Sequence, residues 1–110
     1  MNGQQLFGLV QGGVYPDSRQ KSAEALSAIP FSGYAIGGLS VGEPKADLES
    51  ITLHTTQFLP DEKPRYLMGV GLPDNFEPAI SAGIDMFDCV APTRLARHGN
   101  FFTNAGRRNI

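Results

Sequence analysis

Four short apolar runs, each rich in β-branched, aromatic or large aliphatic residues, constrain the fold of this chain more than any other feature. They cover residues 6–11, 34–39, 65–70 and 86–90, and each is typical of a buried β-strand. The segments between the first three runs carry helical signals, and their lengths suit βα units of about 30 residues. Because each crossover returns the chain in the same direction, the pattern predicts a parallel sheet and the α/β class.

Three helices are expected to begin at polar residues and to end at Gly or Pro. The expected starts are Asp17 or Ser18, Asp47, and Asp74 in a capping box with Glu77. This capping box places Pro78 in the first turn, where proline is tolerated. Pro60 stops the second helix and Gly83 ends the third. The side chains expected on inward-facing stripes are Ala23, Leu26, Ile29, Leu48, Ile51, Thr55, Phe58, Phe76 and Ile80.

Beyond the fourth run we expect no further helix. Residues 101–103 and 107–110, with Asn104-Ala105-Gly106 between them, predict a hairpin with a glycine-containing turn. Four parallel strands can form a small open sheet or one half of an eight-stranded (β/α) barrel, whose full form needs roughly 250 residues. The length of 110 residues predicts a single domain over residues 1–110 and fits either architecture.

Composition excludes several classes of protein. No run approaches the ~20 apolar residues of a membrane span, and no basic start precedes an apolar stretch, so we expect a cytoplasmic protein without membrane contact. Cys89 is the only cysteine, which excludes an internal disulfide, and we expect no metal site. The net charge is −2, yet residues 89–110 hold four arginines and no acid. This basic end suits either phosphate binding or a solvated tail.

Glycines gather at the carboxyl ends of the expected strands, where ligands bind in parallel α/β folds. These glycines occur at residues 12–13, 37–38, 42, 69 and 71. None of them is part of the sequence pattern of a phosphate-binding loop. Asp85 and Asp88 belong to the fourth strand, and side-chain alternation lets only one of them face a cleft. A carboxylate there can be a nucleophile at a sugar carbon or an ordinary cap of backbone amides.

The order of these motifs is similar to that of the queuine tRNA-ribosyltransferases, also called tRNA-guanine transglycosylases. The resemblance covers nearly the whole chain, and the segments that carry it are residues 8–15, 33–43, 64–71, 85–90 and 92–94. It implies strands five to eight of a (β/α) eight-stranded barrel. It also implies a zinc site, whose three cysteines and one histidine would lie beyond Ile110.

The resemblance implies a pentosyltransferase that exchanges guanine at the wobble position of tRNA anticodons for a 7-deazaguanine base. Asp88 would attack the ribose C1′ and form a covalent RNA–enzyme intermediate, which the incoming base then displaces. The residues that would contact the base are Gln11, Gly38 and Leu39 at its edge, Met68 and Gly69 at its flat face, and Glu43. The residues that would hold the anticodon loop are Arg94, Arg97 and His98.

Two departures from the family pattern qualify this expectation. Ser40-Val41 stands where bacterial members usually have Ala-Val and eukaryotic ones Ser-Gly. Val41 fills the space that queuine needs, and so favours a bacterial enzyme and a prequeuosine-type base. No counterpart of the family's second catalytic Asp precedes Gln4, so we expect these residues alone to be inactive and to pair as a homodimer or with a missing barrel half. The alternatives are a noncatalytic tRNA-binding or scaffold subunit, and a small nucleobase-binding module that ignores RNA.

Overall fold

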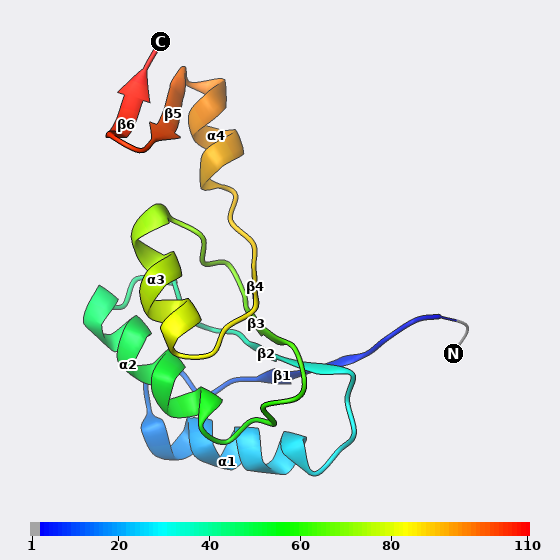
Figure 1. Cartoon of the computed structure of the whole chain (residues 1–110). Coiled ribbons are helices and arrows are strands. Elements are labelled where there is room, and N and C mark those ends of the chain that lie inside the picture. The colour runs from blue at the N-terminus through cyan, green and yellow to red at the C-terminus, as the bar shows by residue number, and fades with distance from the viewer. Residues whose placement is uncertain (1–2) are drawn as a thin grey trace.

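The computed structural model describes residues 3–110 as a four-stranded parallel sheet with helices between its strands, followed by a separate hairpin (Figure 1). The elements of the α/β body are β1 (Phe7–Val10), α1 (Pro16–Ser27), β2 (Gly33–Ile36), α2 (Lys45–Thr56), β3 (Arg65–Leu67), α3 (Pro73–Ser81) and β4 (Met86–Phe87). The last three elements are α4 (Ala91–Arg97), β5 (Asn100–Thr103) and β6 (Gly106–Asn109). The sheet order β1-β2-β3-β4 confirms the α/β prediction and gives a partial barrel.

Alternation along the strands divides the sheet into two unlike faces. Val10, Ile36 and Leu67 point to the side of α1, α2 and α3 and are almost completely buried, and together with residues of the helices they form the core. The opposite side, which we call the open face, is covered by no helix within residues 3–110. Its members line a hollow of about 400 Å³ and include Phe7, Leu9, Ala35, Tyr66, Met68 and Met86.

The first two helices begin earlier than their predicted caps. Helix α1 starts at Pro16, whose fixed φ suits the first turn, and α2 starts directly after Pro44. Neither helix has a side-chain cap, so the prediction of Asp47 as N-cap was wrong. Ile29 lies past the end of α1 and is exposed, whereas Ile51 of α2 is buried as predicted.

The predicted capping box of the third helix is also absent. Helix α3 begins with Pro73 after Leu72 and has no side-chain cap, so Pro78 lies inside the helix rather than in its first turn. Phe76 and Ile80 were predicted to face inward, but they are 39% and 59% exposed. Phe76 packs edge-on against Phe87.

The end of α3 follows the prediction. Gly83 has a φ of 98°, and the N–H groups of Gly83 and Ile84 donate to the carbonyls of Ile80 and Ala79. These are the two bonds of a Schellman motif, which needs a left-handed residue at this position. Gly83 therefore turns the chain from α3 toward β4.

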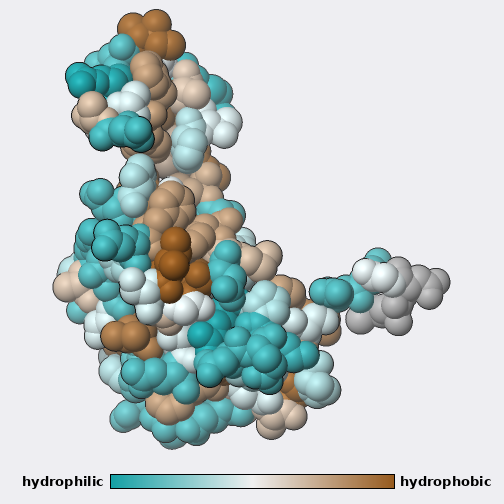
Figure 2. Space-filling model, in the orientation of Figure 1, coloured by the Kyte–Doolittle hydropathy of each residue, from teal (hydrophilic) through white to brown (hydrophobic). Residues whose placement is uncertain are grey.

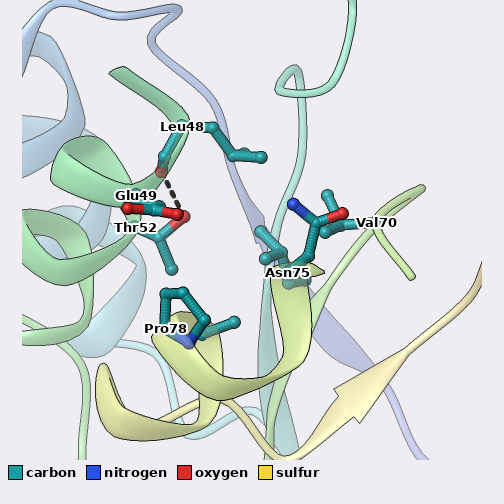
Figure 3. A pocket seen from close by; sticks show the side chains of 8 residues that line it. Leu48, Glu49, Thr52, Val70, Asn75 and Pro78 are labelled. Atoms are coloured by element: carbon teal, nitrogen blue, oxygen red, sulfur yellow. Dashed lines mark hydrogen bonds between the residues drawn. The ribbon is translucent and has the colours of Figure 1, made fainter. Parts of the chain in front are cut away.

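Helices α2 and α3 pack with one small gap between them (Figure 3). The cavity measures about 10 Å³ and is lined by residues that include Leu48, Thr52, Val70, Asn75 and Pro78. A volume of this size holds at most one water molecule. Thr52 donates its hydroxyl to the Leu48 carbonyl of its own helix. Because of its small volume, the cavity is part of the helix packing and offers no room for a ligand.

Helix α4 contradicts the prediction that no helix follows β4. Proline near a helix start is preorganised, and Arg, Leu and Ala then favour the helical conformation, so the sequence from Pro92 to Arg97 continues as a helix. The hairpin of β5 and β6 is confirmed, with antiparallel pairing. Together α4 and the hairpin project from the body as a narrow column (Figure 2). Within residues 3–110, no helix is long and apolar enough to cross a membrane.

Candidate active site

Asp88 lies directly after β4, at the carboxyl end of the sheet. It lines a hollow of about 300 Å³ between the strand ends and the start of α4. Other residues of this hollow, which we call the Asp88 hollow, are Ser40, Gly69, Gly71, Leu72, Cys89 and Arg94. The location agrees with the rule that ligands of parallel α/β folds bind at the carboxyl ends of strands.

Two hydrogen bonds hold the Asp88 carboxylate in place. Oδ1 accepts from the Tyr66 hydroxyl at 2.5 Å and from the Gly69 backbone N–H at 2.7 Å. The Tyr66 bond and, after it, the Gly69 bond lower the pKa of Asp88. The hydrogen bond between Tyr66 and Asp88 also raises the pKa of Tyr66 above its ordinary value. At neutral pH the site therefore presents an ionised carboxylate beside a neutral phenol.

Tyr66 is a site residue that the sequence analysis missed. It lies in β3, two residues before Met68, and pairs in register with Met86 of β4. The period of two along a strand places Tyr66 and Met68 on one face, and this signal could have identified it. Its hydroxyl reaches past the end of β4 to Asp88, so β3 fixes a carboxylate that follows a different strand.

Asp85 belongs to the other end of the sheet. Its Oδ2 accepts a hydrogen bond from the backbone N–H of Arg65 at 3.0 Å, at the start of β3. The two carboxylates are therefore separated by the length of β4 rather than by side-chain alternation: Asp85 precedes the strand and binds backbone at its amino end, and Asp88 follows it and lines the hollow at its carboxyl end.

The ends of β1, β2 and β3 bring Gln11, the Gly37-Gly38 pair and Met68 together. A Cβ built on Gly37 would lie 2.9 Å from Gln11 Nε2 and 3.5 Å from Met68 Sδ, and one built on Gly38 would lie 2.3 Å from Gln11 Oε1. Only glycine permits this close approach, and Gly38 also has a φ of 70°. The backbone of Gly38 is thereby left beside the amide of Gln11, where both can face a ligand edge.

The loop after Gly38 places the remaining predicted base contacts differently. The Leu39 side chain is buried in the core, so only its backbone can contact a base. Ser40 has a φ of 60°, the one positive value among non-glycine residues of the described chain, and it lines the Asp88 hollow. Such a conformation costs free energy and is found preferentially at functional sites.

Arg19 of α1 is a second residue that the sequence analysis missed. Its side chain is completely buried, and it donates from Nε to the Gly13 carbonyl at 2.7 Å and from Nη1 to the Val10 carbonyl at 3.1 Å. Burial lowers the pKa of Arg19, and the charge of Glu43 opposes this shift. Arg19 Nη2 and Glu43 Oε1 are buried without a hydrogen-bond partner among the described residues.

The family model described as queuine tRNA-ribosyltransferase matches residues 1–110. The chain belongs to this family. Curated relatives of the same name include those of Dictyoglomus turgidum, 56% identical over all 110 residues, and Dehalococcoides mccartyi, 54% identical over the same length. The relative from Aliivibrio salmonicida is 59% identical over 92% of the chain. The chain spans 28% of the length of the first two relatives and 27% of the third.

The arginine-rich segment that follows the strands of this queuine tRNA-ribosyltransferase family member forms α4. Arg94 lines the Asp88 hollow. Arg97 and His98 lie at the end of the same helix and are exposed, outside that hollow. The structure thus brings one of the three predicted RNA contacts to Asp88 and leaves the other two on the column.

The zinc site implied by family membership stays a prediction. Within residues 3–110, no three His, Cys, Asp or Glu side chains come close enough to hold a metal ion. Cys89, the only cysteine of the chain, accepts a hydrogen bond at Sγ from the Ala91 N–H.

Proposed function

We propose that this chain carries the nucleophile and most of the base-recognition edge of a tRNA-guanine transglycosylase, an enzyme that exchanges the wobble guanine of tRNA for a 7-deazaguanine base. The observation that carries the proposal is the ionised Asp88 carboxylate, held by Tyr66 and Gly69 in a hollow that also contains Arg94. A fixed carboxylate can displace a base from a sugar carbon, and the nearby guanidinium can bind the adjoining phosphate.

The reaction consists of two displacements at one carbon. Both hydrogen bonds to Asp88 end on Oδ1, which leaves Oδ2 to attack the ribose C1′. The Oδ2–C1′ bond forms while the bond from C1′ to guanine N9 breaks, and guanine leaves with the electron pair and takes up a proton. N9 of the incoming base then loses its proton and attacks C1′, which releases Asp88. Two inversions retain the configuration, as in retaining glycosyl transfer.

The base lies between the strand ends in this proposal. The side-chain amide of Gln11 and the backbone of Gly38 and Leu39 read its edge, and Glu43 responds to the base that is bound. Met68 supplies an apolar wall. Gly69 has open space where a side chain would stand, so the flat face of a base can approach its backbone although its N–H is engaged by Asp88.

The preferred incoming base is of the prequeuosine type. Val41 lies two residues after Leu39 in the chain, and its branched side chain takes up space that a larger substituent would need. Binding should therefore favour a small aminomethyl substituent over the bulkier group of queuine. We place this reaction in the cytoplasm, with the tRNA anticodon loop as the partner of Arg94, Arg97 and His98.

Catalysis requires cover for the open face of the sheet. Leu9 and Met86 are each more than 40% exposed there, and water would reach the sugar from this side. The chain spans 28% of its relatives, so we propose that further strands of a family barrel complete the face. By themselves, residues 1–110 should exchange guanine at a negligible rate. If sedimentation showed a stable homodimer, we would infer instead that a second copy of this chain covers the open face.

Exchange of radiolabelled guanine into tRNA tests the proposal, with the chain mixed with a polypeptide that holds the rest of the Dictyoglomus turgidum relative. Asp88→Asn should abolish exchange and the covalent RNA–protein band on a denaturing gel. Asp85→Asn is the matched control and should retain both, since Asp85 lies at the opposite end of the sheet. Full exchange by Asp88→Asn would contradict the proposal. If the wild-type mixture binds tRNA but exchanges no guanine, the chain is better explained as a noncatalytic tRNA-binding subunit.

A further inference from the structure

A second groove adjoins the Asp88 hollow, between the hairpin and the start of α3. Its volume is about 430 Å³, and its walls include Leu72 and Asp74 on one side and Phe102 and Arg107 on the other. Leu72 lines both cavities, so the hairpin groove and the hollow that contains Asp88 are neighbours that share this residue. The volume lies within the range of about 300–1,000 Å³ found for small-molecule sites.

The hairpin presents one aromatic–arginine pair to this groove and a similar pair to the other side. Antiparallel register places Phe102 opposite Arg107 and Phe101 opposite Arg108. Because side chains alternate along a strand, the two pairs lie on opposite faces of the hairpin. Phe102 and Arg107 line the groove, whereas Phe101 and Arg108 face away from it and are exposed.

The chemistry of the groove suits one unpaired nucleotide. An aromatic ring stacks on any base, and a guanidinium binds phosphate. Arg107 donates from Nε to Asn100 Oδ1 at 3.2 Å, which orients the guanidinium and leaves its terminal N–H groups for a ligand. Asp74 on the opposite wall repels phosphate, so the phosphate must lie on the hairpin side. No acid occurs in residues 89–110 to neutralise the arginines there.

We propose that the hairpin groove binds the nucleotide next to the one whose ribose meets Asp88, with Phe102 stacked on its base and Arg107 on its phosphate. This subsite rests on the proposed function, because it takes the RNA to be the substrate of the Asp88 hollow. It is separate from Arg94, Arg97 and His98, which belong to α4. It makes the hairpin a part of RNA recognition.

Fluorescence anisotropy on the 110-residue chain tests the subsite, with a fluorescein-labelled RNA stem-loop that carries guanine at the wobble position of a seven-nucleotide loop. Phe102→Leu, which keeps an apolar side chain in the hairpin, should raise Kd about tenfold through lost stacking. Phe102→Tyr should restore the affinity. Arg107→Gln should lower the slope of log K against log salt by about 0.7, the value for one phosphate of a single strand.

The other face of the hairpin supplies matched controls. Phe101→Leu and Arg108→Gln remove the same groups and should change Kd less than twofold. An abasic nucleotide on one side of the wobble guanine should weaken wild-type binding about tenfold and should have no further effect on Phe102→Leu. Equal losses for the two faces, or unchanged binding by Phe102→Leu with a wild-type circular dichroism spectrum, would overturn the subsite. Failure of the catalytic proposal is seen separately, as guanine exchange retained by Asp88→Asn in the exchange assay.

Discussion

The two ends of the parallel sheet use buried arginines in different ways. At the amino end, Arg65 of β3 donates to the carbonyls of Thr56, Leu59 and Gly83 and to the Asp61 carboxylate. Its Nε has no partner within residues 3–110, but both terminal nitrogens are engaged. These bonds join the end of α2, the following loop and the turn before β4, so Arg65 holds the segments at this end of the sheet together.

The carboxyl end is left partly unsatisfied. Arg19 bonds only to the carbonyls of Val10 and Gly13, and its Nη2 points to no acceptor among the described residues. Glu43 also has a buried oxygen that meets no partner in the described part of the chain. Buried polar groups are rarely left unpaired unless a ligand or water completes them. The amino end leaves one nitrogen of a single arginine without a partner, whereas the carboxyl end leaves groups of both an arginine and a carboxylate, which is what the proposed binding at this end of the sheet would need.

Replacement of each arginine by methionine is the strongest way to break this contrast. Arg65→Met should lower the free energy of unfolding by about 3 kcal/mol, because several buried carbonyls lose a charged donor. Arg19→Met should lower it by about 2 kcal/mol, since only two acceptors are affected. Urea denaturation followed by circular dichroism measures both.

Guanine affinity, measured by calorimetry on protein that is still folded, should fall only in Arg19→Met. Lys21→Met, at an exposed position of α1, is the control and should change neither quantity.

A smaller effect is expected from Gly38→Ala. The new methyl group would meet Gln11 Oε1, and the positive φ of this position costs an L-residue about 1 kcal/mol. Gln11 must then rotate away, so guanine binding should weaken more than stability does. Gly42→Ala provides the comparison, because Gly42 also has a positive φ but open space around it. Equal loss of guanine affinity in both variants would show that the Gln11 contact is irrelevant.

Tyr66→Phe should give the smallest change, a shift in the titration of Asp88. In the wild type the lowered pKa of Asp88 gives stability that is present at neutral pH and is lost as the pH falls through that pKa. Without the phenol hydroxyl, the pKa of Asp88 rises toward its ordinary value, so this contribution to stability becomes smaller and is lost over a narrower pH range. Carbon-detected NMR titration of the carboxyl group measures the shift. An unchanged titration curve would mean that the Gly69 N–H alone sets the pKa.

The sequence pattern predicted the body of the fold well because burial of parallel strands leaves a strong local signal. The runs around Val10, Ile36 and Leu67 became the sheet, and residues just after the strands, such as Val70, pack in the core. The helix starts were less predictable, since Asp47 and Asp74 are good caps but prolines directly before or at the helix starts took precedence. Helix α4 was missed because it is short and buries none of its side chains.

The candidate site was predictable only where a residue acts next to its own strand end. Asp88 and Gly69 could be placed in this way, because the chain itself carries them to the carboxyl edge. Tyr66 and Arg19 act on neighbouring elements through long side chains. The period of two along β3 could have placed Tyr66 on the face of Met68, but the partner that each side chain reaches depends on strand register and on the packing of α1, which no local pattern in the sequence encodes.

Helix α4 offers a way to follow the proposed RNA binding. A seven-residue helix with no buried side chain gains too little from its own hydrogen bonds to persist continuously in water. Its amide hydrogens should therefore exchange with deuterium much faster than those of α1 or α2. A nucleic acid that settles on Arg94 would slow this exchange, so deuterium uptake along Ala91–Arg97 reports occupancy of the column without any label on the RNA.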